Sequence, residues 1–257
     1  MDGLILKLVL TPALVGAASL AGRRWGSAVS GWFVGLPLTS GPITFFLALN
    51  HGAAFAAAAA VGTLAGAISQ AAFCLAYGWI AFRYSWPLTV AASCLAFAAS
   101  TAALQHLVLP LVSLFLTVIA ALVVALRLMP GRAKASSAAV GPLPRWDIPA
   151  RMVVATAFVL LLTGMAPILG PGLTGLLAPF PLYAAILAIF AHYLEGPAPA
   201  AGVLRGLLLG LFAFAGFFLV LAALIERAGI APAFAAAIAV AFALQAGSLW
   251  TLRRASA

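Results

Sequence analysis

The sequence predicts an all-α polytopic membrane protein with about nine transmembrane helices, arranged as two inverted four-helix repeats joined by a spacer helix. The first observation is composition: of 257 residues, 66% are hydrophobic and 7% are charged, and the mean hydropathy is +1.21. A water-soluble domain cannot hide so much apolar surface behind so few charges. The second is the length of the apolar runs, several of which reach the roughly 20 residues that a helix needs to cross a bilayer. The third is a repeated sequence pattern, described below.

Nine apolar runs are bounded by Gly, Pro, Arg or Asn, and each is predicted to be one span. The fourth and fifth are separated only by Gln105 and His106. The first run also resembles a secretory signal, but Asp2 before it and Arg23 and Arg24 after it reverse a signal peptide's charge order, so a span is favoured. The nine predicted spans are 4–21, 28–49, 53–82, 86–104, 107–129, 149–169, 172–194, 199–226 and 229–251.

The distribution of positive charge predicts the orientation. Loops rich in Lys and Arg stay cytoplasmic, and nine spans put eleven of the 13 basic residues on one side, leaving Lys7 and Arg227 on the other. We therefore expect the N-terminus to lie outside and the C-terminus to lie in the cytoplasm. The net charge of +9 is scattered between apolar segments, so nucleic acid is not an expected partner.

An internal repeat is visible when the chain is shifted by 144 residues. Residues 30–74 then align with 174–218, with 13 identities in 45 positions. We expect a first repeat over 1–105, a spacer helix with a cytoplasmic linker over 106–148, and a second repeat over 149–257. Because the spacer adds one crossing, the second repeat is inverted relative to the first, as in many secondary transporters.

Matching prolines interrupt the second and seventh predicted spans. Two prolines in one helix remove backbone donors and break or kink it. Paired interruptions in two halves indicate a transporter binding site, and purely structural kinks are the equal alternative. The candidate substrate-binding residues are Pro37, Thr39, Ser40, Pro42, Pro181 and Tyr183. A further polar residue within a span, Gln70, is expected to join helices.

Two other groups are candidates for function or packing. His192 and Glu195 share a helix face and precede Arg205, so they form a candidate proton relay or ion pair, with simple solvation at the membrane interface as the alternative. Gly62 and Gly66 match Gly206 and Gly210, a spacing that lets helix backbones approach closely. We expect these glycines to pack span 3 against span 8.

Absent features narrow the function. The four carboxylates lie away from the span centres, which argues against a cationic substrate. Cys74 and Cys94 fall within spans, so no disulfide is expected. No metal, haem, nucleotide or nucleophile motif is recognisable, so we expect no cofactor, no metal and no enzyme.

The second half resembles the GlpM-type family of small bacterial inner-membrane proteins. The resemblance lies in the segment from Gly175 through Pro179, Pro181 and His192 to Gly196, and the first half keeps only Gly35, Leu36, Pro37 and Gly52 of it. Those proteins are single units of about this repeat's length, linked to alginate production. The resemblance implies an inner-membrane location, and it implies that this chain fuses two units that elsewhere pair as an antiparallel dimer.

The leading functional hypothesis is a secondary transporter of a neutral or anionic small solute, working by alternating access around the interruptions in spans 2 and 7. The alternative is a non-transporting membrane partner of an envelope or polysaccharide assembly system, which needs no central cavity. The expected partners are the lipid bilayer and an unidentified solute, and homodimer formation is left open.

Overall fold

The computed structural model describes residues 36–130 and 146–254, with scattered positions between 5 and 20. Those residues form helices joined by short turns, and the described part of the chain contains no strand. The predicted first span and the predicted 130–148 linker lie largely outside them. The helices are α3 (Ser40–His51), α4 (Ala53–Ile80), α5 (Trp86–Leu104), α6 (Leu111–Leu128), α7 (Asp147–Leu177), α8 (Leu182–Glu195), α9 (Pro197–Ala228) and α10 (Ile230–Arg254).

Six of these helices are long and apolar enough to cross a membrane, as expected for a polytopic membrane protein. The six are α4, α5, α6, α7, α9 and α10. By contrast, α3 and α8 have only 12 and 14 residues and do not reach the length of a full crossing. Within the predicted spans 28–49 and 172–194, where the prolines predicted a break or kink, residues 36–39 and 178–181 are not helical.

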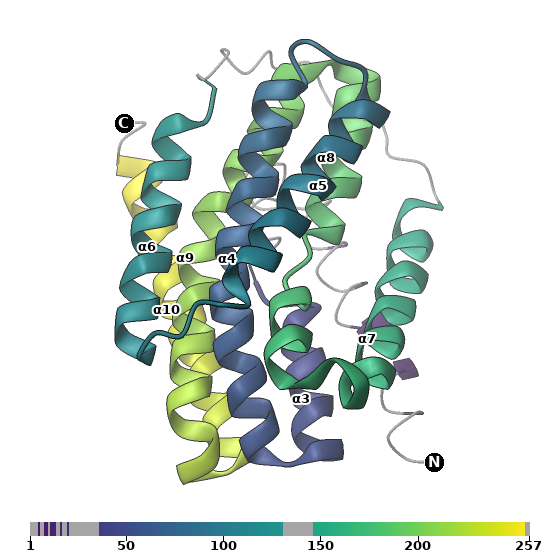
Figure 1. Ribbon diagram of the computed structural model, residues 1–257. Helices are drawn as coiled ribbons and strands as arrows, with labels where there is room; N and C mark the ends of the chain where they lie inside the picture. Colours follow the sequence, from purple (N-terminus) through teal and green to yellow (C-terminus); the bar gives the residue numbers. More distant parts are fainter. Residues whose placement is uncertain are drawn as a thin grey trace.

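The centre of the molecule is the pair α4 and α9, which run in opposite directions through its length (Figure 1). In the most apolar 18-residue stretch of each helix, 67% of the residues of α4 and 61% of those of α9 are buried. The corresponding share is 22% in each of α5, α6 and α10. The many Ala and Gly residues of α4 allow close approach, and the Leu and Phe residues of α9 fill the space between the helices. These two helices form the core on which the others pack.

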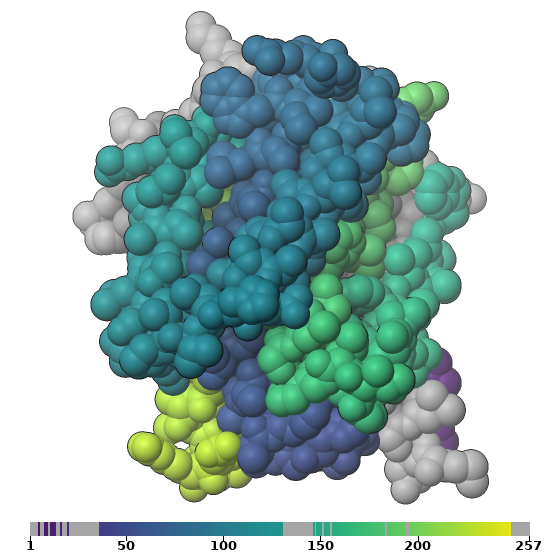
Figure 2. Space-filling view, in the orientation of Figure 1, coloured from purple at the N-terminus to yellow at the C-terminus, as the bar shows by residue number. Residues whose placement is uncertain are grey.

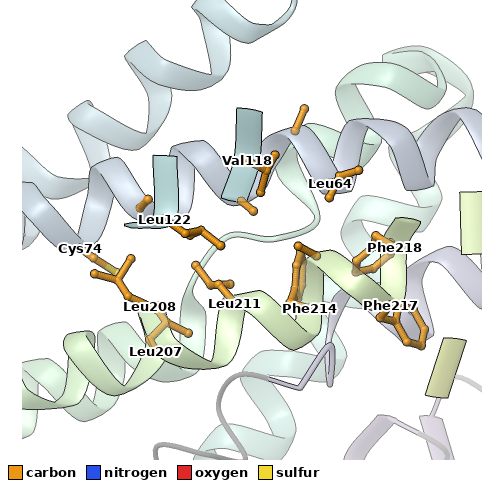
Figure 3. Packing of buried hydrophobic residues seen from close by; sticks show 14 of the residues in the cluster. Leu64, Cys74, Val118, Leu122, Leu207, Leu208, Leu211, Phe214, Phe217 and Phe218 are labelled. Atoms are coloured by element: carbon orange, nitrogen blue, oxygen red, sulfur yellow. The ribbon is translucent and has the colours of Figure 1, made fainter. Parts of the chain in front are cut away.

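The expected spacer helix, α6, contacts both central helices. Val118 and Leu122 of α6 are fully buried and lie beside Leu64 of α4 and Leu211 of α9 (Figure 3). The outer surfaces of α5 and α6 expose large apolar side chains such as Leu95 and Val112. Figure 2 shows these two helices spread over one face of the molecule, which is suited to contact with lipid.

The ends of the helices fall into two groups. The α4–α5 connection and the ends of α6 and α10 lie at the upper end of Figure 1, whereas the α3–α4 and α9–α10 turns lie at the lower end. The upper group includes Arg83, which follows α4, and Arg127, in the last turn of α6. The lower group includes Arg227, in the last turn of α9.

The turns before α4 and α9 have the same backbone conformation. Gly52 has φ 88° and ψ 170°, and Gly196, which lies 144 residues later, has φ 102° and ψ −175°. This extended region at positive φ is accessible essentially only to glycine. One glycine therefore reverses the chain in each hairpin.

We expect Gly196→Ala to destabilise the protein by about 1–3 kcal/mol, because a Cβ strains a backbone at this φ. No atom lies within 4 Å of the added Cβ, so the effect isolates the backbone conformation. Gly202→Ala in α9 is the matched control, since Gly202 is helical, is equally unobstructed and gains helix propensity. Thermal unfolding in detergent measures both, and equal midpoints would contradict the assignment of strain to Gly196.

Candidate functional site

The two helix interruptions meet at one cavity. Leu36, Thr39 and Ser40 line it from the first interruption, and Pro179, Phe180 and Pro181 line it from the second. The free space is about 350 Å³ when the part that is open to the outside is included. The centre of a water-sized sphere can move through about 20 Å³ of it. A single water needs roughly 10–15 Å³ by this measure. In this conformation the cavity therefore holds water or a solute of a few atoms.

What we call the first interruption is the non-helical segment 36–39, which ends where α3 begins at Ser40. Leu38 donates its N–H to the carbonyl of Leu36 at 2.7 Å, so the chain makes a tight turn next to Pro37. Pro42 lies in the first turn of α3, where a missing N–H is tolerated. The helix therefore starts inside the protein, at the cavity.

The second interruption covers residues 178–181 and ends where α8 begins at Leu182. It repeats the same tight turn, with the N–H of Leu182 donating to the carbonyl of Phe180 at 2.7 Å. The Phe180 ring lies edge-on to Phe97 of α5 at 5.2 Å between ring centroids, and Phe73 of α4 lies at 6.2 Å. These aromatic contacts fix the position of the interruption against α4 and α5.

Leu182 and Ala184 line the cavity from the first turn of α8, and the other lining residues come from the two central helices. Gln70 lies on α4, and Leu207, Leu211 and Phe214 lie on α9. Gln70 is only 6% exposed, and its Oε1 atom has no hydrogen-bond partner among the residues that the structure describes. Its neighbour Ser69, by contrast, accepts a hydrogen bond from Thr101 at 2.9 Å and so joins α4 to α5. The Gln70 amide lacks such an interhelical bond.

Of the candidate substrate-binding residues, Thr39, Ser40 and Pro181 line the cavity. Pro37 and Pro42 shape the turn and the helix start instead, with Pro37 lying 3.7 Å from the position of a Cβ on Gly41. The side chain of Tyr183 lies outside the described residues. Sequence reasoning did not assign Gln70 or Phe214 to the site, although they stand 144 residues apart and so occupy equivalent positions of the repeated pattern.

One member of the candidate relay, His192, contacts Tyr77 in the described structure. The Nδ1 atom of His192 on α8 lies 3.4 Å from the hydroxyl of Tyr77 on α4, and the two rings meet edge to face. Tyr77 is fully buried, so this contact ties α8 to the central helix. The Glu195 side chain is outside the described residues, and Arg205 is half-buried in α9. The predicted relay or ion pair among His192, Glu195 and Arg205 stays a prediction.

The glycine pair of α4 packs against the segment before the second interruption. A Cβ on Gly62 would lie 3.2 Å from Cα of Gly175, and one on Gly66 would lie 2.8 Å from the carbonyl oxygen of Leu176. The expected partner of this pair was span 8, which is α9, and the contacts found are with the end of α7 instead. On α9, Gly210 is buried and Gly206 is half-buried.

Within residues 36–130 and 146–254, no group of three or more His, Cys, Asp or Glu side chains is placed to hold a metal. Comparison of the chain with protein-family models, curated proteins and solved structures finds no match.

Proposed function

We propose that this protein is a secondary transporter of a neutral or anionic small solute, and that the cavity between the two interruptions is its solute site. One observation carries the proposal: the ends of two half-length helices, α3 and α8, border the same internal cavity. Interrupted helices inside a membrane protein are tolerated where they border a cavity, and paired interruptions mark the solute site in several transporter folds.

An inverted repeat is the second part of the proposal. Ala53 and Pro197, which begin α4 and α9, stand 144 residues apart, and so do Trp86 and Ile230, which begin α5 and α10. The cavity is lined by three pairs of residues with this same separation: Leu36 with Phe180, Ser40 with Ala184, and Gln70 with Phe214. This spacing supports a cavity on a pseudo-two-fold axis between the halves, where alternating access can open it to either side.

The proposed orientation has the N-terminus out and the C-terminus in, within a bacterial inner membrane. Its support is that the α4–α5 connection and the ends of α6 and α10 share one end of the molecule (Figure 1). Arg83 lies in that connection, and Arg127 lies in the last turn of α6. Positively charged connections stay on the cytoplasmic side. The exposed apolar surface of the outer helices makes the lipid bilayer the surrounding partner.

Thiol accessibility tests the proposal without knowledge of the solute. The test uses a chain in which Cys74→Ser and Cys94→Ser remove the native thiols. We expect Ser40→Cys in this chain to be labelled by a membrane-impermeant thiol reagent that is added outside right-side-out vesicles, and equally when it is added outside inside-out vesicles. Ser69→Cys is the matched control, because Ser69 is buried one residue from Gln70 and bonded to α5, away from the cavity lining. Labelling of Ser40→Cys from one side alone, or from neither, would count against alternating access.

The prolines give a second test. We expect Pro37→Ala and Pro181→Ala to lower solute flux severalfold while leaving membrane insertion unchanged, because alanine favours a continuous helix over proline by about 3 kcal/mol and so tends to close each interruption. Flux is measured by light scattering of proteoliposomes, and insertion by the yield of folded protein in the membrane fraction. Equal flux in the variants and the unaltered chain would contradict the proposed role of the interruptions.

A further inference from the structure

Two helices begin at the cavity, and neither start is neutralised. Ser40 and Ala184, in the first turns of α3 and α8, line the cavity, and their N–H groups have no backbone acceptor in the described parts of the chain. Neither helix has an acidic residue in its first turn or a side-chain capping bond. Because a helix N-terminus carries about half a positive charge, the two starts together favour a ligand with about one negative charge.

The lining side chains do not alter this charge balance. Every side chain described as lining the cavity is uncharged, so no lysine or arginine is present to balance a second negative charge. No carboxylate is among the described lining residues to repel an anion. The electrostatics therefore match a monovalent anion better than a divalent one, and a cation is disfavoured.

The Gln70 amide adds a second, independent requirement. Gln70 lines the cavity, and its Oε1 atom is buried and lacks a partner among the described residues. A carbonyl-type oxygen can only accept a hydrogen bond, so the missing partner is a donor. A ligand made only of acceptor atoms would leave this oxygen unsatisfied, which weakens binding roughly tenfold or more.

We infer that the cavity binds a small monovalent oxyanion that carries a hydroxyl group, with the size and shape of hydrogencarbonate. Its charged oxygens accept from the N–H groups of Ser40 and Ala184, and its hydroxyl donates to Gln70. The limited free space admits an ion of a few atoms. This inference rests on the proposed function for the identity of the solute site, and it adds the chemical class of the solute.

The proposed ligand needs a negative charge and a hydrogen-bond donor, and three planar solutes of similar size test these two properties separately. Hydrogencarbonate has both, nitrate has the charge alone, and urea has donors without charge. Binding of each to the full chain in lipid nanodiscs is measured by calorimetry in a slightly alkaline buffer. We expect hydrogencarbonate to bind roughly tenfold or more tightly than either of the others. Equal binding of nitrate would overturn the role of Gln70, equal binding of urea would overturn the anion site, and no binding of any solute would show that the cavity holds only water.

Variants at Gln70 complete the test. We expect Gln70→Leu and the closer-sized Gln70→Met to lower hydrogencarbonate affinity to that of nitrate and to leave nitrate affinity unchanged. Gln245→Leu is the matched control, because Gln245 is buried in α10 and does not line the cavity. If either Gln70 variant that folds still prefers hydrogencarbonate to the same degree, the inference is wrong.

Binding is measured here without a gradient, so this result is separate from transport. Hydrogencarbonate that is bound but never carried would overturn the proposed transporter and leave the site assignment intact. Flux of solutes with no preference for a hydroxyl-bearing anion would do the reverse.

Discussion

Replacing Ala184 with leucine is expected to reduce solute flux and binding roughly 10- to 100-fold. Ala184 lies in the first turn of α8, is 1% exposed and lines the cavity. The added isobutyl group occupies the space in which the solute would lie. Forcing additional methylene groups into filled space costs about 1–3 kcal/mol, and each 1.4 kcal/mol is a tenfold change in affinity.

Ala191→Leu is the control for the effect of a larger side chain on α8. Ala191 is partly buried on the same helix and packs against the core without lining the cavity. Proteoliposome flux is compared after both proteins are shown to be monodisperse and to unfold at similar temperatures. If Ala184→Leu retains full flux in a folded protein, the solute does not pass through this cavity.

The second large effect is expected at Gly175, close to the C-terminal end of α7. A Cβ at this position would collide with the carbonyl oxygen of Ala59 and lie 2.9 Å from its carbonyl carbon and 3.0 Å from its Cα. These are backbone atoms of α4, which cannot move aside as a flexible side chain can. We expect Gly175→Ala to destabilise the protein by about 3 kcal/mol, at the upper end of the usual cost of overpacking.

Gly164→Ala provides a control in the part of α7 that precedes its non-helical Gly170, because nothing lies within 4 Å of a Cβ at Gly164. That substitution is expected to be neutral or slightly stabilising, since alanine is the better helix former. Thermal unfolding of the purified proteins in detergent compares the two. Similar unfolding temperatures would mean that α4 and α7 are not in the close contact described above.

The sequence predicted the long helices well and the interrupted ones only in part. The predicted span 86–104 coincides with α5, and the predictions for α4, α6, α9 and α10 differ from the structure by at most four residues at any end. Long apolar runs bounded by polar residues, Gly or Pro define such helices locally. The prolines indicated where spans 2 and 7 would deviate, but whether a proline bends a helix or ends it depends on which groups nearby accept the freed backbone atoms.

The sequence predicted the lining residues next to the prolines, but it did not predict the lining side chains that come from the long helices. Thr39, Ser40 and Pro181 follow from the prolines next to them, because the lining there is local in sequence. The position of Gln70 around the α4 axis, relative to helices far away in the chain, is set by packing and is not encoded in its neighbours. Packing likewise brings His192 to Tyr77, 115 residues away in the chain, a contact that its sequence neighbours did not indicate.

The three matched pairs of lining residues differ in chemistry. The members from the first half include Ser40 and Gln70, whereas the members from the second half are Ala184 and Phe214. Two identical chains would have to place the same side chain at both positions of each pair. In one chain the two positions of a pair can carry different side chains, so this cavity can be polar at Ser40 and Gln70 and apolar at Ala184 and Phe214, a difference that no symmetric assembly of identical chains can have.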